Sequence, residues 1–152
     1  MSKITPFLWF DTQAEEAMNF YISLFKNSKV NNISRGPDGK VFTVAFELDG
    51  QEFMGLNSGP MFKFNEAVSM YVNCESQAEV DYFWEAFMMN GGKEPSCGWL
   101  KDKWGLSWQI IPKQLGELLG DPDAEKSKRV MDAMLKMEKI IVADLKKAYD
   151  GE

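Results

Sequence analysis

A four-residue motif occurs twice in this chain, each time at the start of a predicted helix. Residues 12–15 (TQAE) are repeated as residues 76–79 (SQAE), 64 positions later. Both copies have the Ser/Thr-x-x-Glu pattern of a capping box, in which a hydroxyl and a carboxylate accept hydrogen bonds from free N–H groups at a helix N-terminus. Apolar residues recur with the helical period after each copy. The repeat therefore predicts two equivalent modules.

The same order of strands surrounds both helices. Asp-Gly pairs at 38–39 and 49–50, which favour hairpin turns, separate the strands of the first module. We expect strands over 4–10, 30–35, 41–48 and 51–57 in the first module and over 68–74, 93–95, 97–101 and 106–111 in the second. Each module then has the order βαβββ. The prediction is an α+β fold with modules over about 1–60 and 66–112.

The residues after Pro112 form a helical extension, 113–152. Leucines at helical spacing predict a short helix that Gly120 ends, and Asp121-Pro122 predicts the start of a longer one. Helical spacing continues to the end of the chain, and the β-branched cluster 140–142 is where a break could fall. A chain of 152 residues with 45% hydrophobic residues can bury about 70% of its unfolded surface. We therefore expect a single domain, 1–152.

Charge and composition argue against several classes of function. The net charge is −6 and the basic residues are scattered, which disfavours nucleic acid as a partner. There is no signal-peptide pattern and no apolar run of membrane-spanning length, so we expect a cytoplasmic protein that does not bind membranes. Cys74 and Cys97 match no zinc spacing and are predicted to be free thiols.

Four features of the chain point to a known family: the duplicated βαβββ order, the opening strand into a helix with Phe20-Tyr21 near its end, Gly59-Pro60, and above all residues 97–112 (CGWLKDKWGLSWQIIP). In these features the chain resembles the PhnB-like proteins, a group also labelled 3-demethylubiquinone-9 3-methyltransferase domain. These proteins belong to the vicinal oxygen chelate superfamily, together with glyoxalase I and bleomycin-resistance proteins. The resemblance implies an incompletely closed eight-stranded barrel, the glyoxalase/bleomycin resistance fold, with a pocket on its concave face. It also implies a homodimer.

The metal and cofactor chemistry of the superfamily has little support in these residues. The resemblance puts the metal-ligand positions near Thr5, Gly55, Ala67 and Gln109, and of these only Gln109 has a usable donor atom. The chain contains no histidine, so we expect no metal. No glycine-rich turn between a strand and a helix could hold an adenosyl cofactor. We expect no cofactor.

Alternation along the strands gives a candidate ligand site. If one parity of each strand points into the barrel, aromatic rings and a few amide and hydroxyl groups face one cavity. The predicted ligand-binding residues are Trp9, Phe53, Asn57, Ser69, Tyr71, Trp99 and Gln109. A filled barrel interior is the alternative reading of the same pattern.

Three functions remain open at the level of sequence. The first is metal-free binding of a small molecule in the barrel. The second is a metal-independent enzyme acting on a small aromatic or quinone-like metabolite, with Tyr71, Cys97 or a carboxylate as the candidate reactive group. The third is a dimeric interaction module without a ligand.

Overall fold

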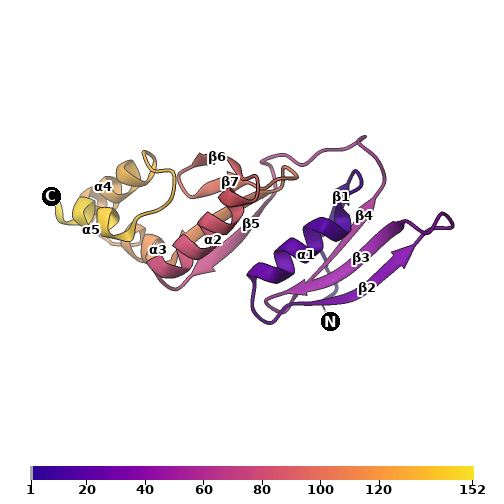
Figure 1. Cartoon of the computed structure of the whole chain (residues 1–152). Helices are drawn as coiled ribbons and strands as arrows, with labels where there is room; N and C mark the ends of the chain where they lie inside the picture. Colours follow the sequence, from indigo (N-terminus) through magenta and orange to yellow (C-terminus); the bar gives the residue numbers. More distant parts are fainter. Residues whose placement is uncertain (1) are drawn as a thin grey trace. The chain divides into compact units, whose positions relative to one another are not determined.

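The computed structural model describes residues 2–152. The described residues form two compact units, 2–64 and 65–152 (Figure 1). Each unit contains a four-stranded sheet and a helix against one face of it. The predicted duplication of a βαβββ module is therefore confirmed.

The sheet of the first unit has the strand order β1-β4-β3-β2. Strand β1 is parallel to β4, and the other two pairs are antiparallel. Hairpin turns join neighbouring strands in antiparallel pairs, whereas β1 reaches β4 only after the helix and two strands. The elements are β1 (Phe7–Phe10), α1 (Ala14–Leu24), β2 (Lys29–Arg35), β3 (Val41–Leu48) and β4 (Gln51–Asn57).

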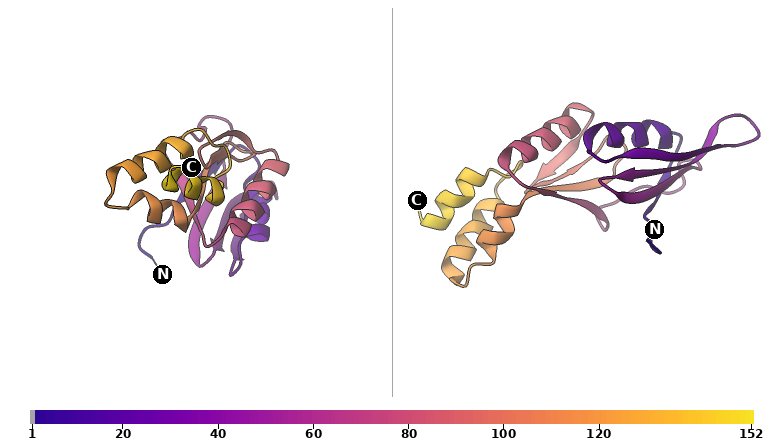
Figure 2. Two further views of the ribbon diagram at one scale, coloured as in Figure 1. Left: turned by 90° about the vertical axis from the view of Figure 1, so that its left-hand side faces the viewer. Right: turned by 90° about the horizontal axis from the view of Figure 1, so that it is seen from below.

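Helix α1 covers one face of this sheet with a buried aromatic cluster. Tyr21 is fully buried, and its ring lies 6.4 Å from that of Phe46. Phe46 in turn stacks on Phe53 with a centroid distance of 5.5 Å. Leu8 and Phe10 of β1 are buried on the same side. The view from below in Figure 2 shows α1 lying along this face.

The sheet of the second unit repeats this topology with the order β5-β8-β7-β6, and β5 is parallel to β8. Helix α2 packs on one face, where the ring of Phe87 lies 4.8 Å from that of Trp108. The elements are β5 (Ser69–Cys74), α2 (Gln77–Met89), β6 (Lys93–Ser96), β7 (Trp99–Lys101) and β8 (Ser107–Pro112).

A buried carboxylate shapes the turn between β7 and β8. Asp102 is 1% exposed and accepts hydrogen bonds from its own turn and from β8. Its Oδ1 accepts from the backbone N–H groups of Trp104 (2.9 Å) and Leu106 (3.0 Å), and its Oδ2 accepts from Trp108 Nε1 (2.9 Å). The carboxylate therefore joins the turn to the helix-covered face of β8.

Three helices follow the second sheet: α3 (Lys113–Leu119), α4 (Ala124–Met134) and α5 (Val142–Asp150). They bury a common core with the end of β8, made of Ile111, Leu115, Val130, Ile140 and Leu145. The predicted helical extension is confirmed. Among the described residues, no helix is long and apolar enough to cross a membrane.

The starts of two helices differ from the prediction. Thr12 does not cap α1, which begins at Ala14 after Gln13 and has no cap from a neighbouring side chain. In the second module Ser76 does cap α2, because its hydroxyl accepts from Glu79 N. Helix α4 begins two residues after the predicted Asp121-Pro122, since Asp123 is its N-cap.

The helical spacing after Asp123 is broken between α4 and α5, at residues 135–141. Tertiary hydrogen bonds explain the break. The carbonyl oxygens of Met137 and Glu138 accept from the backbone N–H groups of Cys97 and Gly98. Gln77 of α2 accepts from Val142 N at 2.7 Å and donates to Ile140 O at 3.0 Å. These backbone groups therefore bond to the turn before β7 and to α2, and they are not available for the hydrogen bonds of a continuous helix.

We predict that Asp102→Ala lowers the free energy of unfolding by about 3–5 kcal/mol, because it leaves an indole N–H and two backbone N–H groups without their acceptor. Asp102→Asn keeps one oxygen acceptor and should cost less. Urea denaturation followed by tryptophan fluorescence measures both changes. Glu117→Ala, at an exposed position of α3, is the control, with an expected change within about 0.5 kcal/mol. Equal stability of Asp102→Ala and this control would contradict the role of the carboxylate.

Candidate functional site

The strand register brings four of the predicted site residues onto one face of the second sheet. Tyr71 lies opposite Gln109, Gln109 lies opposite Trp99, and Ser69 lies opposite Ser107. Directly paired residues point to the same side of a sheet. Trp108 and Ile110, of the other parity, are buried on the α2 side. Ser69, Tyr71, Trp99 and Gln109 therefore share the face opposite α2.

Polar contacts organise part of this face. Gln109 Nε2 donates to the hydroxyl of Ser69 at 2.9 Å, which links β8 to β5. The ring of Tyr71 is 53% exposed beside them. Trp99 is half-buried on the other side of Gln109. The face presents two aromatic side chains around a fixed amide.

A surface hollow of about 340 Å³ opens on the second unit, beside Trp99. We call it the Lys101 hollow. Lys101 Nζ forms ion pairs with Glu66 at 2.7 Å and with Glu94 at 2.8 Å. The lysine side chain is 20% exposed, and the two carboxylates are more than 60% exposed. The hollow is lined by Glu66, Glu94, Ser96, Cys97, Trp99, Leu100, Lys101 and Ser107.

These ion pairs stabilise the charged forms of Lys101 and Glu66. Hydrogen bonds to Glu66 and Glu94 raise the pKa of the Lys101 ammonium. The hydrogen bond from Lys101 lowers the pKa of Glu66. At neutral pH the lysine is therefore protonated and the Glu66 carboxylate is charged.

Ser107 contributes a buried polar atom to the Lys101 hollow. Its side chain is 1% exposed, and its Oγ has no hydrogen-bond partner within residues 2–152. A buried hydroxyl without a partner costs about 1–3 kcal/mol. This cost makes Ser107 the polar group of the site that gains most from a bound ligand.

Trp9 lies in the first unit, on the sheet face opposite α1. Its Nε1 donates to Gly59 O at 2.9 Å, and its ring meets that of Phe62 edge to face at 4.9 Å. Its strand pairs Trp9 with Leu56. The grouping of Trp9 with the site residues of the second unit stays a prediction.

The predicted orientation of Phe53 and Asn57 is wrong. Phe10 lies opposite Asn57, and Leu8 lies opposite Gly55, so these residues share the face that α1 covers. Phe53 is buried there against Phe46. The error is a shift of one residue in β4, which moves every side chain of a strand to the other face.

Asn57 instead caps α1. Its Oδ1 accepts from Ala14 N at 2.8 Å, and its Nδ2 donates to Val41 O at 3.2 Å. The side chain thereby supplies from β4 the helix cap that Thr12 was predicted to provide. No local sequence pattern indicates this contact, because the two residues are 43 positions apart.

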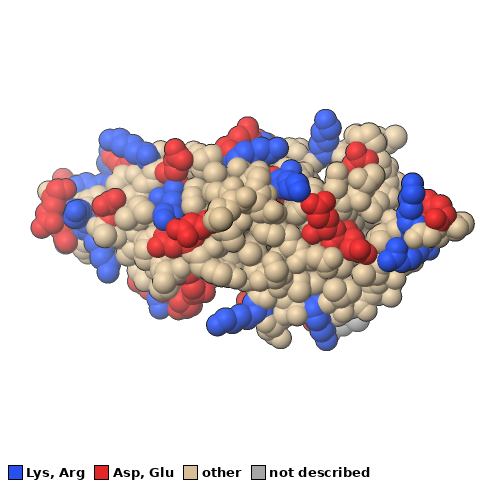
Figure 3. All heavy atoms as spheres, viewed as in Figure 1, with Lys and Arg blue, Asp and Glu red and all other residues tan. Residues whose placement is uncertain are grey.

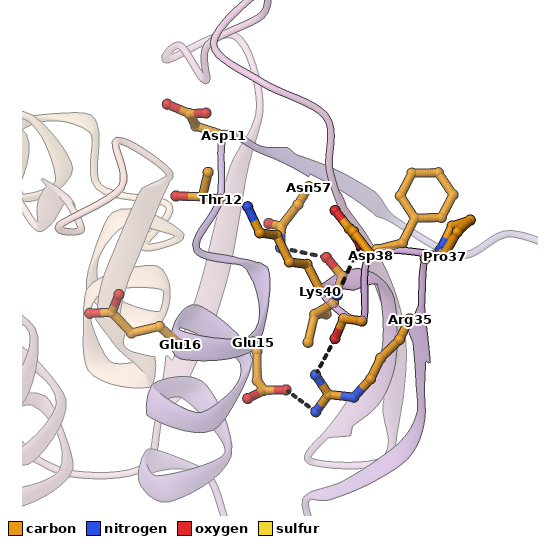
Figure 4. Close-up of a pocket in the computed structure, with 13 residues that line it drawn as sticks. Asp11, Thr12, Glu15, Glu16, Arg35, Pro37, Asp38, Lys40 and Asn57 are labelled. Carbon is orange, nitrogen blue, oxygen red and sulfur yellow. Dashed lines mark hydrogen bonds and ion pairs between the residues drawn. The ribbon is translucent and has the colours of Figure 1, made fainter.

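A second, larger hollow of about 1010 Å³ lies at this end of the first unit (Figure 4). Some of its polar side chains already have partners within the hollow. Arg35 reaches Glu15 at 3.9 Å and donates to Gly39 O at 3.1 Å, and Asp38 accepts from Lys40 N at 3.0 Å. No unpartnered buried side chain of the described residues lines it. The Lys101 hollow is therefore the stronger candidate for a ligand site.

The residues at the predicted metal positions do not fit a divalent cation. Gly55 faces α1, where an added Cβ would lie 3.3 Å from Val44, and β4 presents Met54 and Leu56 on its other face. Gln109 uses its amide N–H on Ser69. Among residues 2–152 no three His, Cys, Asp or Glu side chains are grouped to hold a metal. The absence of a metal stays a prediction.

Two further observations bear on chemistry and partners. Burial raises the pKa of the Cys74 thiol to about 12, so this cysteine is not a nucleophile at neutral pH.

Lys and Arg side chains are mixed with Asp and Glu over the face of the molecule that Figure 3 shows. That face presents no continuous basic surface for a phosphate backbone.

Two βαβββ modules with these strand orders define the glyoxalase/bleomycin resistance fold class. Residues 2–111 match the family described as 3-demethylubiquinone-9 3-methyltransferase. The match covers well over half of the 152 residues. The chain belongs to this family.

Solved structures agree with this assignment. A putative 3-demethylubiquinone-9 3-methyltransferase, PhnB protein, from Bacillus cereus is 40% identical with a TM-score of 0.67, over 73% of this chain and 99% of that one. A protein from Pseudomonas aeruginosa is 17% identical with a TM-score of 0.57, over 74% and 98% of the two chains. The fosfomycin resistance protein FosX from Listeria monocytogenes, complexed with Mn(II) and sulfate, is 13% identical with a TM-score of 0.55, over 71% and 89%.

The similarities to the Pseudomonas aeruginosa protein and to FosX show the fold alone. No match was found among curated proteins. The family match ends at residue 111, so helices α3, α4 and α5 lie outside the matched region.

We predict that Asn57→Ala destabilises the protein by about 1–2 kcal/mol, since Ala14 N loses its cap. Asn57→Asp keeps an oxygen acceptor at the helix N-terminus and should restore most of this loss. Thermal unfolding by circular dichroism measures the difference. Asn73→Ala, at an exposed position of β5, is the matched control. If Asn57→Ala melts like the control, the assigned cap is wrong.

Proposed function

We propose that this protein binds a small organic molecule, without a metal ion, on the face of the second sheet opposite α2. The observation that carries the proposal is the buried Ser107 hydroxyl without a partner in the Lys101 hollow. A ligand atom that bonds this hydroxyl would remove a cost of about 1–3 kcal/mol already present in the free protein. Such a site gains binding energy without having to break an internal hydrogen bond.

The neighbouring side chains suit a ligand with a flat apolar part. Trp99 lines the hollow and lies opposite Gln109 in the sheet. An aromatic ring at the wall of a hollow offers a large contact area together with fixed orientation. Gln109 is held by Ser69, so its amide oxygen has a defined direction. A few fixed polar groups among aromatic side chains are the usual composition of a small-molecule site.

The relatives support a binding role in general terms. FosX, a protein of the same fold class, is complexed with Mn(II) and sulfate. This chain lacks imidazole altogether and has no metal-binding group among residues 2–152. We therefore propose that it keeps the binding role of the fold and holds its ligand through side chains alone.

Catalysis has less support than binding. A general base at neutral pH needs a free basic group within the site. Lys101 is held protonated by Glu66 and Glu94, and Cys74 is a buried thiol with a raised pKa. The family label also requires an adenosyl cofactor, for which the chain has no glycine-rich strand-to-helix turn. Binding without turnover is the simpler function for this site.

We predict that small aromatic fragments, screened in the presence of EDTA, shift the NMR signals of the Trp99 indole N–H and the Gln109 side-chain amide. Trp99→Ala should weaken the best fragment about tenfold, a loss of about 1.4 kcal/mol of stacking contact. Ser107→Ala should weaken binding while raising the unfolding midpoint, because it removes a buried hydroxyl that has no partner in the free protein.

The matched control is Tyr82→Ala, which removes a half-exposed aromatic ring from α2 on the other side of the same unit. It should leave the fragment affinity unchanged. Fragment binding that depends on EDTA-removable metal, or that survives both Trp99→Ala and Ser107→Ala, would refute the proposal.

We also infer that two copies of the chain associate. The support is the set of large apolar side chains exposed in the first unit, which includes Ile4, Phe7, Met54, Met61 and Phe62. Exposed apolar side chains of this size commonly mark an interface. An interaction module without a ligand would use the same surface.

We predict that sedimentation velocity at micromolar concentration gives twice the mass of one chain. Met61→Asp should shift the equilibrium toward single chains, because Met61 is 77% exposed in the first unit. Met89→Asp, at a position 88% exposed on α2, is the control. A single-chain mass for the unmodified protein would contradict association.

A further inference from the structure

We infer that the ligand of the Lys101 hollow carries a cationic amino group joined to a flat apolar group. The inference rests on the proposed function, since it names the chemical class of the ligand for the same site. It follows from the balance of charge around Lys101, the unused acceptors of the two carboxylates, and the position of Ser107.

The charged groups of the hollow carry an excess of negative charge. One ammonium and two carboxylates line it, so their charges sum to −1. Lys101 lies at ion-pair distance from both carboxylates, and its charge is therefore balanced within the group. A cationic ligand would complete the neutralisation, whereas an anionic ligand would add a second excess charge.

The hydrogen-bonding capacity of the two carboxylates also favours a cationic ligand. A carboxylate has about four lone-pair sites, and the ion pairs with Lys101 engage one oxygen each, Glu66 Oε1 and Glu94 Oε2. Both side chains remain more than 60% exposed. An ammonium has only donors, so it can bond to these oxygens without displacing Lys101. A ligand carboxylate would have to compete with them for Lys101.

The remaining wall of the hollow suits the rest of such a molecule. The Ser107 hydroxyl is buried in the lining and can accept a hydrogen bond from an amino group. Trp99 offers an aromatic ring, which attracts a cation near its face by about 0.5–1 kcal/mol at an exposed site. Ser107 is the independent sign of a ligand here, because two surface carboxylates alone also occur where nothing binds.

The test compares three probes that share a phenyl ring and a two-carbon chain: phenethylamine, 2-phenylethanol and 3-phenylpropionate. Each is titrated into the full chain and followed through the Trp99 indole N–H and the Gln109 amide. We expect phenethylamine to bind about tenfold more tightly than the alcohol and the carboxylate to bind most weakly. The preference should shrink as salt is added, because exposed charges are screened.

Substitutions of the charged residues in the hollow separate the contribution of charge to the affinity from that of shape. Glu66→Gln and Glu94→Gln should each weaken phenethylamine about threefold to fivefold, as expected for one exposed ion pair, and leave 2-phenylethanol unchanged. Lys101→Met removes the competing ammonium while keeping an unbranched side chain, and it should tighten phenethylamine binding. The control is Glu85→Gln, which removes an exposed charge from α2 and should change none of the three affinities.

The outcomes distinguish the two proposals. If 2-phenylethanol or 3-phenylpropionate binds as tightly as the amine at the hollow, or if the glutamate variants leave the amine affinity unchanged, the ligand class is wrong while the binding site stands. If none of the probes shifts either signal at millimolar concentration, both the ligand class and the site are refuted.

Discussion

The buried carboxylate of Asp102 is the interaction on which the site of the second unit depends. It holds the backbone of the turn between β7 and β8 and, through Trp108 Nε1, the helix-covered face of β8. By fixing this hairpin it fixes the pairing of Trp99 with Gln109 and of Lys101 with Ser107. A buried carboxyl group costs desolvation energy, which the N–H donors of Trp104, Leu106 and Trp108 offset. The side chains that line the Lys101 hollow are positioned as a consequence.

The helical extension holds the other side of the same hairpin. The carbonyl oxygens of Met137 and Glu138 accept from Cys97 and Gly98, directly before β7. Gly98 has a φ of +87°, and an added Cβ would lie 2.7 Å from Ile111 and 3.1 Å from Ile140. Only glycine fits this close approach without displacing the core of the extension. The extension lies beyond the family match, yet it packs directly against residues that line the hollow.

The two modules show how similar sequences reach different local solutions. Ser76 caps α2 with its own hydroxyl, whereas α1 takes its cap from Asn57 in β4. The motif of the first module has Thr12 at the position that corresponds to Ser76. The N-cap position of α1 is nevertheless Gln13, one residue later. Asn57 reaches Ala14 because β4 is paired with β1 and ends beside the start of α1. A local cap has thus been replaced by a contact between distant residues.

The sequence by itself determined the element types, the duplication and the family. Capping motifs, Asp-Gly turns and hydrophobic periods act over a few residues, so they can be interpreted without the fold. The same patterns placed Ser69, Tyr71, Trp99 and Gln109 on a common face. Only the tertiary structure decided the orientation of Phe53 and Asn57, because β4 has apolar residues of both parities and its pairing with β1 is not set by a hairpin. The pairing of Lys101 with Glu66 and Glu94 could not be predicted from the sequence either, nor could the lack of a partner for the Ser107 hydroxyl. Both depend on where separate strands and loops meet in space.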